Sequence, residues 1–581
     1  TAVLSANLLN EARVAYLDGD PVTLWEAGTL STTYTRAGTV PFTIGQSRSS
    51  DIFSRQFQVS DTATWSAGKH AVRAGVSVVR HISGGTGSEP GTPILGTFTF
   101  KTTTTAPFDQ LTLNDVQSYT QPIDFGIDSY DLKQWLLTGF VQDSIRLLPD
   151  LTVDIGVRYD RQTLTEAKTN FSPRLGFGWH PGGDQRLSVR GGYGMYYTQI
   201  RSNAVAGYLV GGLDGLTTYT AVPGQLGFPT CLTGACLPLS FDPRKLPASQ
   251  LPARDVTIQA GQRDFYRAQF ARYGLNFDLL PNYPDKLVNP RSQVISIGAE
   301  RELTKGLFLG ADYVHQHLDD IDRTVDLNAP AAFDRTAPGQ TRTVAAANAT
   351  RPILPVNGGV RQVNVLMNLG EADYDGLQTQ LRYNGARLQA SLSYTLSKAT
   401  NTSEPDGNGI GPNDPNVTRL GEVERGPSVV DQRHRAVIAL SYRLPYEITV
   451  GTLTQLASAR PFNATTGVDN NGDGANNDRP VVDGQVISKS AFRGSATADL
   501  SAFIEGRVPL GGLGVILRVE GFNLTNHGNY LGRAQAVYGN SATPNASFGQ
   551  LAAAGTASSA IPAFANVDPP RMFQISARLA F

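Results

Sequence analysis

Large apolar residues alternate with polar or small residues along much of this chain. In residues 151–160, LTVDIGVRYD, every odd position carries a large side chain and every even position a polar residue or glycine. Residues 187–197, 388–397 and 436–442 follow a similar pattern. Because successive side chains of a strand point to opposite sides, these segments predict β-strands with one apolar and one polar face.

Short turns join the predicted strands in pairs, and long connections separate one pair from the next. The turns contain Gly, Pro or Asn, which favour chain reversal; they lie at 66–69, 148–150, 181–184, 304–306, 384–385, 444–446 and 509–512. The long connections lie at 201–290, 317–373, 401–432, 461–494 and 526–570, and the connection before Phe171 is a short exception. Transmembrane barrels of the outer membrane have this asymmetry, with short periplasmic turns and long extracellular loops.

The pattern therefore predicts an all-β fold, a transmembrane antiparallel up-and-down β-barrel that occupies residues 1–581 as one domain. Seven hairpins, a first strand near 10–17 and a last strand at 571–581 give sixteen or more strands, and residues 96–101 and 118–128 could add others. Closure is expected because lipid cannot satisfy an open sheet edge. Aromatic residues near strand ends predict girdles at the two membrane surfaces; they are Trp135, Tyr159, Trp179, Tyr196, Tyr197, Tyr313, Tyr442 and Tyr446.

The amino-acid composition argues against several other classes of protein. The 581 residues include 49 basic and 50 acidic side chains, so a nucleic-acid partner, which needs clustered positive charge, is not expected. Charged residues make up 17% of the chain and hydrophobic residues 40%, which disfavours disorder, and no apolar run approaches the ~18 residues of a spanning helix. A soluble β protein is the remaining alternative.

Several segments, in order, resemble the barrels of TonB-dependent receptors of the Oar-like group. They include LTGFVQDSIRLLPDLTVDIGVRYD at 137–160, SPRLGFGWHPGGDQRLSVRGGYGMYY at 172–197 and VEGFNLTNHGNYLG at 519–532. The resemblance implies a complete barrel of about 22 strands in the outer membrane of a Gram-negative bacterium. It also implies a plug inside the barrel, a TonB box that contacts the energy-transducing complex, and energised uptake of an extracellular solute.

The chain departs from this family pattern at its start, because no plug, TonB box or upstream domain precedes Thr1. Two alternative functions therefore stay open: an adhesin-like or surface-assembly barrel, and a passive porin. Outer-membrane lipid and lipopolysaccharide are expected to surround the wall. The last strand alternates in polarity and ends on Phe581, which resembles the signal recognised by the barrel assembly machinery.

A loop rich in Asp, Asn and Gly is the candidate metal site. Asp469, Asn471 and Asp473 alternate before a glycine, as in the first half of an EF-hand loop, and Asp478 could complete the set. The twelfth position is Pro480 rather than the usual Glu, so a turn stabilised by the same residues is the alternative. Any Ca²⁺ would be structural, and no other cofactor is expected.

Two pairs of residues could form local sites. Cys231 and Cys236 lie in one short loop and predict a local disulfide, which implies an oxidising compartment. His315 and His317 share the lipid-facing side of a strand, so we favour polar residues at the membrane interface over a metal site.

Strand parity directs seven charged side chains into the lumen, where they could contact a plug or a solute; they are Arg158, Arg190, Glu300, Arg382, Arg518, Glu520 and Arg578. No catalytic motif is present, so an enzyme is not expected.

Overall fold

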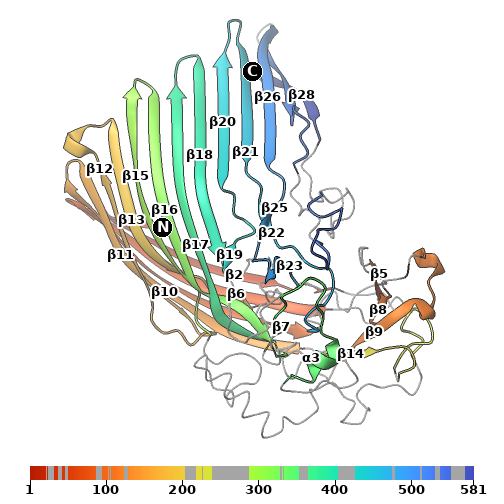
Figure 1. Cartoon of the computed structure of the whole chain (residues 1–581). Coiled ribbons are helices and arrows are strands. Elements are labelled where there is room, and N and C mark those ends of the chain that lie inside the picture. Colours follow the sequence, from red (N-terminus) through yellow and green to blue (C-terminus); the bar gives the residue numbers. More distant parts are fainter. Residues whose placement is uncertain are drawn as a thin grey trace.

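The computed structural model describes most of the chain (Figure 1). The described residues are 1–20, 22–23, 32–36, 42–45, 50–86, 95–101, 104, 106–123, 129–202, 217–225, 227–237, 287–326, 330–331, 333–351, 364–402, 425–473, 478–510, 513–529, 537–550 and 570–580.

In the described part of the chain, sixteen long strands form one curved antiparallel wall in which each strand pairs with its neighbours along the chain. They are β2 (Leu8–Gly19), β6 (Ser50–Ala67), β7 (His70–Thr86), β10 (Ser129–Leu148), β11 (Leu151–Gln162), β12 (Asn170–Trp179), β13 (Leu187–Tyr197), β15 (Arg291–Thr304), β16 (Leu307–Asp326), β17 (Asn364–Asn384), β18 (Leu388–Asn401), β20 (His434–Arg443), β21 (Ile448–Ala457), β26 (Thr497–Leu510), β27 (Leu513–Phe522) and β28 (Met572–Ala580).

Three short strands add to this meander within the described residues. β1 (Ala2–Ser5) pairs with β2, β3 (Val22–Thr23) with β6, and β19 (Gly426–Pro427) with β18. Within the described residues, no hydrogen-bonded pairing joins β28 to β1 or β2. The predicted all-β, up-and-down wall of an outer-membrane barrel is confirmed, and its short turns and long loops lie at opposite ends (Figure 1).

One predicted connection is wrong in its bounds. The segment 317–373 was expected to be a loop, but β16 continues to Asp326 and β17 begins at Asn364. The apolar alternation stops near His315 because the outward side chains become polar there. The backbone ladder continues beyond that point, because strand pairing needs no apolar face.

The two faces of the wall differ as predicted. Large apolar side chains on the outer face are exposed, including Ile297 at 56%, Ile504 at 49% and Ile575 at 78%. Exposed aliphatic residues in this density suit contact with lipid rather than water.

The prediction that Tyr196 belongs to an aromatic girdle is wrong, because Tyr196 lies at an inward position of β13 beside Arg174. The adjacent tyrosines at 196 and 197 occupy opposite faces because successive strand positions alternate.

A second, five-stranded sheet lies beside the loop end of the wall (Figure 1). Tyr34, Phe98, Phe100, Val116 and Tyr119 form its core. The predicted strands near 96–101 and 118–128 therefore exist, but they belong to this sheet and not to the wall. Its strands are β4 (Thr32–Thr35), β5 (Phe42–Ile44), β8 (Thr97–Phe100), β9 (Val116–Ile123) and β14 (Thr217–Ala221).

The remaining described elements are short. The one-turn helices are η1 (Phe108–Gln110), η2 (Leu113–Asp115), η3 (Pro181–Gly183) and α3 (Val344–Asn348). Two small hairpins belong to the loop after β21: β22 (Pro461–Phe462) with β25 (Phe492–Arg493), and β23 (Val481–Val482) with β24 (Gln485–Val486). None of the helices in the described part of the chain has the length and apolarity needed to span a membrane.

Candidate functional site: the inner wall and the extracellular loops

The inward charges predicted from strand parity form ion pairs. Arg158 Nε lies 2.7 Å from Asp160 Oδ2 on the same strand. Across strands, Arg382 Nη2 lies 3.4 Å from Glu300 Oε1. On β27, Arg518 Nη2 lies 2.7 Å from Glu520 Oε1. Arg578, at an inward position of β28, is the exception and makes no ion pair within the described part of the chain. The lumen is therefore polar but largely charge-compensated.

Arg190 and Asp312 form an ion pair that crosses an intervening strand. Arg190 on β13 donates to Asp312 on β16 through Nε at 2.9 Å and Nη2 at 2.6 Å. Gly298 of β15 lies between them, and a Cβ there would meet Asp312 Oδ1 at 1.9 Å. The glycine therefore leaves the space through which this bidentate pair forms.

Among the described residues, cavities of different sizes open on the inner wall, and two of them exceed 500 Å³. One of about 550 Å³ lies over β10–β13 and is bordered by Arg73, Arg158, Arg174 and Tyr196. The other, of about 520 Å³, lies over β18–β27 and includes Phe503, whose ring lies under the Arg518 guanidinium at 3.9 Å. Both combine arginines with aromatic rings, an arrangement that suits polar solutes carrying negative charge.

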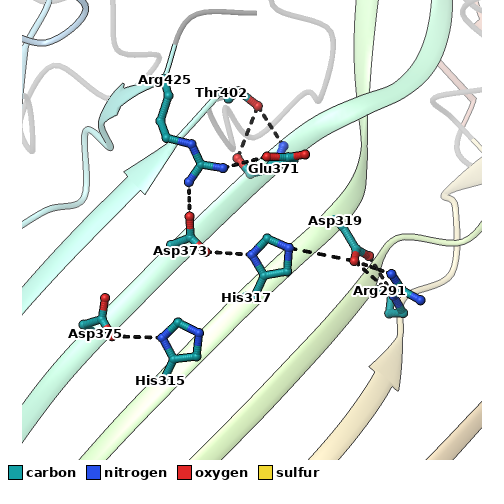
Figure 2. A network of polar contacts seen from close by, with 9 residues as sticks. All are labelled: Arg291, His315, His317, Asp319, Glu371, Asp373, Asp375, Thr402 and Arg425. Atoms are coloured by element: carbon teal, nitrogen blue, oxygen red, sulfur yellow. Dashed lines mark hydrogen bonds and ion pairs between the residues drawn. The ribbon is translucent and has the colours of Figure 1, made fainter.

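Where the outward side chains of β16 and β17 become polar, they form a network of contacts, which Figure 2 shows from close by. His315 Nδ1 lies 2.9 Å from Asp375 Oδ1, and His317 Nδ1 lies 2.6 Å from Asp373 Oδ1. Arg425 joins Asp373 to Glu371, and its Nη2 lies 2.6 Å from Glu371 Oε2 (Figure 2).

Tyr313 lies two positions before His315 on the same face of β16, and its hydroxyl donates to Asp375 Oδ1 at 2.6 Å. The network therefore includes an aromatic residue at its lower end. Both histidines face carboxylates, and in the described residues no set of three His, Cys, Asp or Glu side chains is arranged to hold a metal ion. These contacts support the interpretation of the histidines as interfacial polar residues.

The predicted calcium loop is folded on itself. Asp469 Oδ1 accepts the backbone amides of Gly472 at 2.6 Å and Asp473 at 3.1 Å. Asn471 Oδ1 accepts the amide of Asp473 at 2.8 Å, and Asp478 Oδ2 accepts that of Asn471 at 3.2 Å. The structure thus brings the four predicted residues into one turn, and calcium binding by them stays a prediction.

Three arginines from the extracellular loop between β16 and β17 hold this turn. Arg342 Nε donates to the Asn471 carbonyl at 2.8 Å, and Arg351 Nη2 donates to the Asp473 carbonyl at 3.0 Å. Arg335 Nη2 lies 3.3 Å from Asp478 Oδ1, and both side chains are almost fully buried. We call residues 333–351, 464–473 and 478–490 the loop cluster. Local sequence patterns carry no signal for these arginine contacts, because the contacts join loops more than 100 positions apart.

Burial raises the pKa of Asp478 to about 6, against the opposing effects of Arg335 and two backbone amides. The folded state then binds more protons than the unfolded state between about pH 4 and pH 6, so stability rises as the pH falls through that window. In calcium-free buffer, we expect the loop cluster to gain about 1 kcal/mol between pH 7 and pH 5. Hydrogen exchange of peptides from 464–473 would measure the gain, and Asp478→Asn should remove it.

Calcium should raise the stability of the same turn if the EF-hand-like spacing is functional. We expect millimolar CaCl₂ to raise the melting temperature and to increase hydrogen-exchange protection of 464–473, and EGTA to reverse both changes. Asp473→Asn should weaken the response, whereas Asp184→Asn in the β12–β13 turn should leave it intact. Unchanged protection with and without calcium would favour a turn that needs no metal.

The two cysteines lie in a loop beside the five-stranded sheet. The structure joins Cys231 and Cys236 in a disulfide with a Cα–Cα distance of 5.3 Å. Tyr34 donates from its hydroxyl to the Leu232 carbonyl at 2.7 Å, which attaches the disulfide loop to the sheet. Extracellular segments far apart in the sequence therefore share one core.

Comparison with known proteins agrees with this geometry. The model of the family described as "Outer membrane beta barrel domain" matches residues 1–167 and 160–514. The TonB-dependent transporter Oar of Myxococcus xanthus is 24% identical over 277 residues, which are 46% of this chain and 24% of Oar. The outer membrane transporter YddB from Escherichia coli has a similar fold, with a TM-score of 0.55 at 10% identity over 99% of this chain and 61% of YddB. The chain thus spans about a quarter of Oar, and the resemblance to Oar-like TonB-dependent receptors is confirmed.

Proposed function

Because this chain belongs to the outer membrane β-barrel domain family, we propose that it forms the wall and extracellular mouth of a TonB-dependent transporter for energised solute uptake. The observation that carries the proposal is the contrast between the two faces of the wall. Apolar side chains such as Ile297 and Ile504 face outward, whereas charged side chains line a lumen with two large cavities. Such a wall supports a polar route through the outer membrane.

Solute capture is assigned to the extracellular loops. Two of the long connections seen in the sequence, 201–290 and 401–432, are our candidates for capture, and they lie largely outside the described residues. In the described part, the loop cluster and the five-stranded sheet provide ordered surfaces at the mouth of the barrel. A plug, the TonB complex and the assembly machinery are the partners proposed on the family resemblance, since Oar is a TonB-dependent transporter.

The test is uptake in living cells. Spent medium of strains with and without this gene would be compared by mass spectrometry, each with and without functional TonB. We expect a set of solutes to be depleted only when both are present. Depletion that needs the protein but not TonB would indicate a passive porin. Loss of surface attachment without any change in uptake would indicate the adhesin-like alternative.

A further inference from the structure

Arg174 on the inner wall differs from Arg158 and Arg190 on the two adjacent strands, which are both held in ion pairs. Arg174 of β12 is exposed to the lumen, and no carboxylate in the described residues lies within ion-pair distance of it. Its guanidinium lies over the ring of Tyr196 at 4.7 Å. Stacking of this kind fixes the plane of the guanidinium and leaves its N–H edge available to an anion.

A buried hydroxyl without a partner lies beside this arginine. Ser172 is two positions before Arg174 on the same face of β12, and it is 1% exposed. Its Oγ makes no hydrogen bond with the described part of the chain. Ser172, Arg174 and Tyr196 border one cavity of about 210 Å³. Buried hydroxyl groups normally have a hydrogen-bond partner, so this Oγ is a donor still to be satisfied beside the cavity.

The far side of the cavity is held by a network of buried amides. Asn289 Nδ2 donates to Gln162 Oε1 at 2.8 Å, and Asn170 Nδ2 donates to Asn289 Oδ1 at 2.9 Å. Gln162 Nε2 donates in turn to Gln134 Oε1 at 2.8 Å. All four side chains are at most 4% exposed. Because the network is satisfied internally, it makes a rigid wall and reduces the ordering cost of binding.

We propose that this cavity binds a carboxylate, with Arg174 and Ser172 as the donors. The unpaired positive charge selects an anion over a neutral group, and the planar guanidinium matches the planar carboxylate. A volume of about 210 Å³ accommodates the carboxylate and a few attached atoms. The adjoining cavity of about 550 Å³ shares Arg158, Arg174 and Tyr196 and could hold the rest of the molecule.

The carboxylate site rests on the proposed function, because a solute that is transported through the barrel passes the inner wall at this cavity. A carboxylate of a polypeptide inside the lumen has the same chemistry and is the second source. Binding to the purified protein does not depend on TonB. Failure of the uptake test with intact carboxylate binding would therefore count against the proposed function alone.

The test is saturation-transfer NMR on the full 581-residue chain folded in detergent micelles. The probes are two matched pairs, acetate with acetamide and glucuronate with glucose. We expect transfer to the carboxylate member of each pair and about a tenfold weaker affinity in Arg174→Gln, the usual scale for a charged hydrogen bond. Ser172→Ala should weaken binding less. Arg578→Gln, which removes the same charge from β28, should leave it unchanged.

Equal transfer to the charged and neutral probes, or unchanged affinity in Arg174→Gln, would overturn the proposal. Heat-modifiable migration on a gel would verify that each variant is folded. The same probes applied to protein purified from its own outer membrane distinguish the two sources. Binding that persists there indicates a solute site, and binding that disappears indicates a carboxylate supplied by a polypeptide in the lumen.

Discussion

Asp478→Ala should destabilise the loop cluster by about 3–5 kcal/mol, the usual cost of removing one partner of a buried ion pair. Asp478 is 0% exposed and its Oδ1 lies 3.3 Å from Arg335 Nη2. Its Oδ2 also accepts the backbone amides of Asn470 at 2.8 Å and Asn471 at 3.2 Å. Unlike protonation, which keeps the carboxyl oxygens in place, the alanine variant would leave both amides without their acceptor as well as Arg335 without its counter-charge. Hydrogen exchange of peptides from 464–473 and 333–351 would measure the loss.

Two controls test whether the expected loss of stability comes from the burial of the Arg335–Asp478 ion pair. Replacing both partners, as Arg335→Met with Asp478→Leu, should cost less than Asp478→Ala because no buried charge is left alone. Asp18→Ala removes one of the two acidic partners of Arg55, the other being Asp20, and both side chains of the Arg55–Asp18 pair are at least 40% exposed. The exposed change should cost under about 1 kcal/mol. Equal losses in Asp18→Ala and Asp478→Ala would contradict a special role for the buried pair.

The wall of the barrel could be predicted because lipid imposes a strict pattern on it. Each membrane-spanning strand must place apolar side chains outward, so the period of two is visible in the sequence. β13 (Leu187–Tyr197) and β11 (Leu151–Gln162) were found with bounds within two residues of those observed. The same parity correctly directed Arg158 and Arg190 inward.

The loops could not be predicted to the same extent, because no period constrains them. The five-stranded sheet joins residues near 34, 98, 119 and 220, and its strands are too short for periodicity to show which segments pair. The upper parts of β16 and β17 were missed because outward residues such as His317 and Asp373 are polar. Ser172 and Arg174 share the inward parity of Arg158, so the sequence could have placed them in the lumen, but it could not show that their polar groups lack partners.

Ile297→Lys tests whether the outer face of the wall contacts lipid. Ile297 lies on the outward side of β15, midway between the polar outward residues Gln293 and Arg301, and it is 56% exposed. A lysine near the midplane of the lipid face of a barrel costs about 2–4 kcal/mol. We expect the free energy of unfolding from lipid vesicles to fall by that amount.

Ser296→Lys is the matched control, because Ser296 is the adjacent residue and borders the 550 Å³ lumen cavity. The same charge placed in a water-filled lumen should cost well under about 1 kcal/mol, since its hydration is retained. Urea titrations of both variants in thin-bilayer vesicles, followed by tryptophan fluorescence, would give the two values. A larger loss for Ser296→Lys than for Ile297→Lys would reverse the assignment of the two faces, and with it the lumenal location of Arg174 and of the carboxylate site.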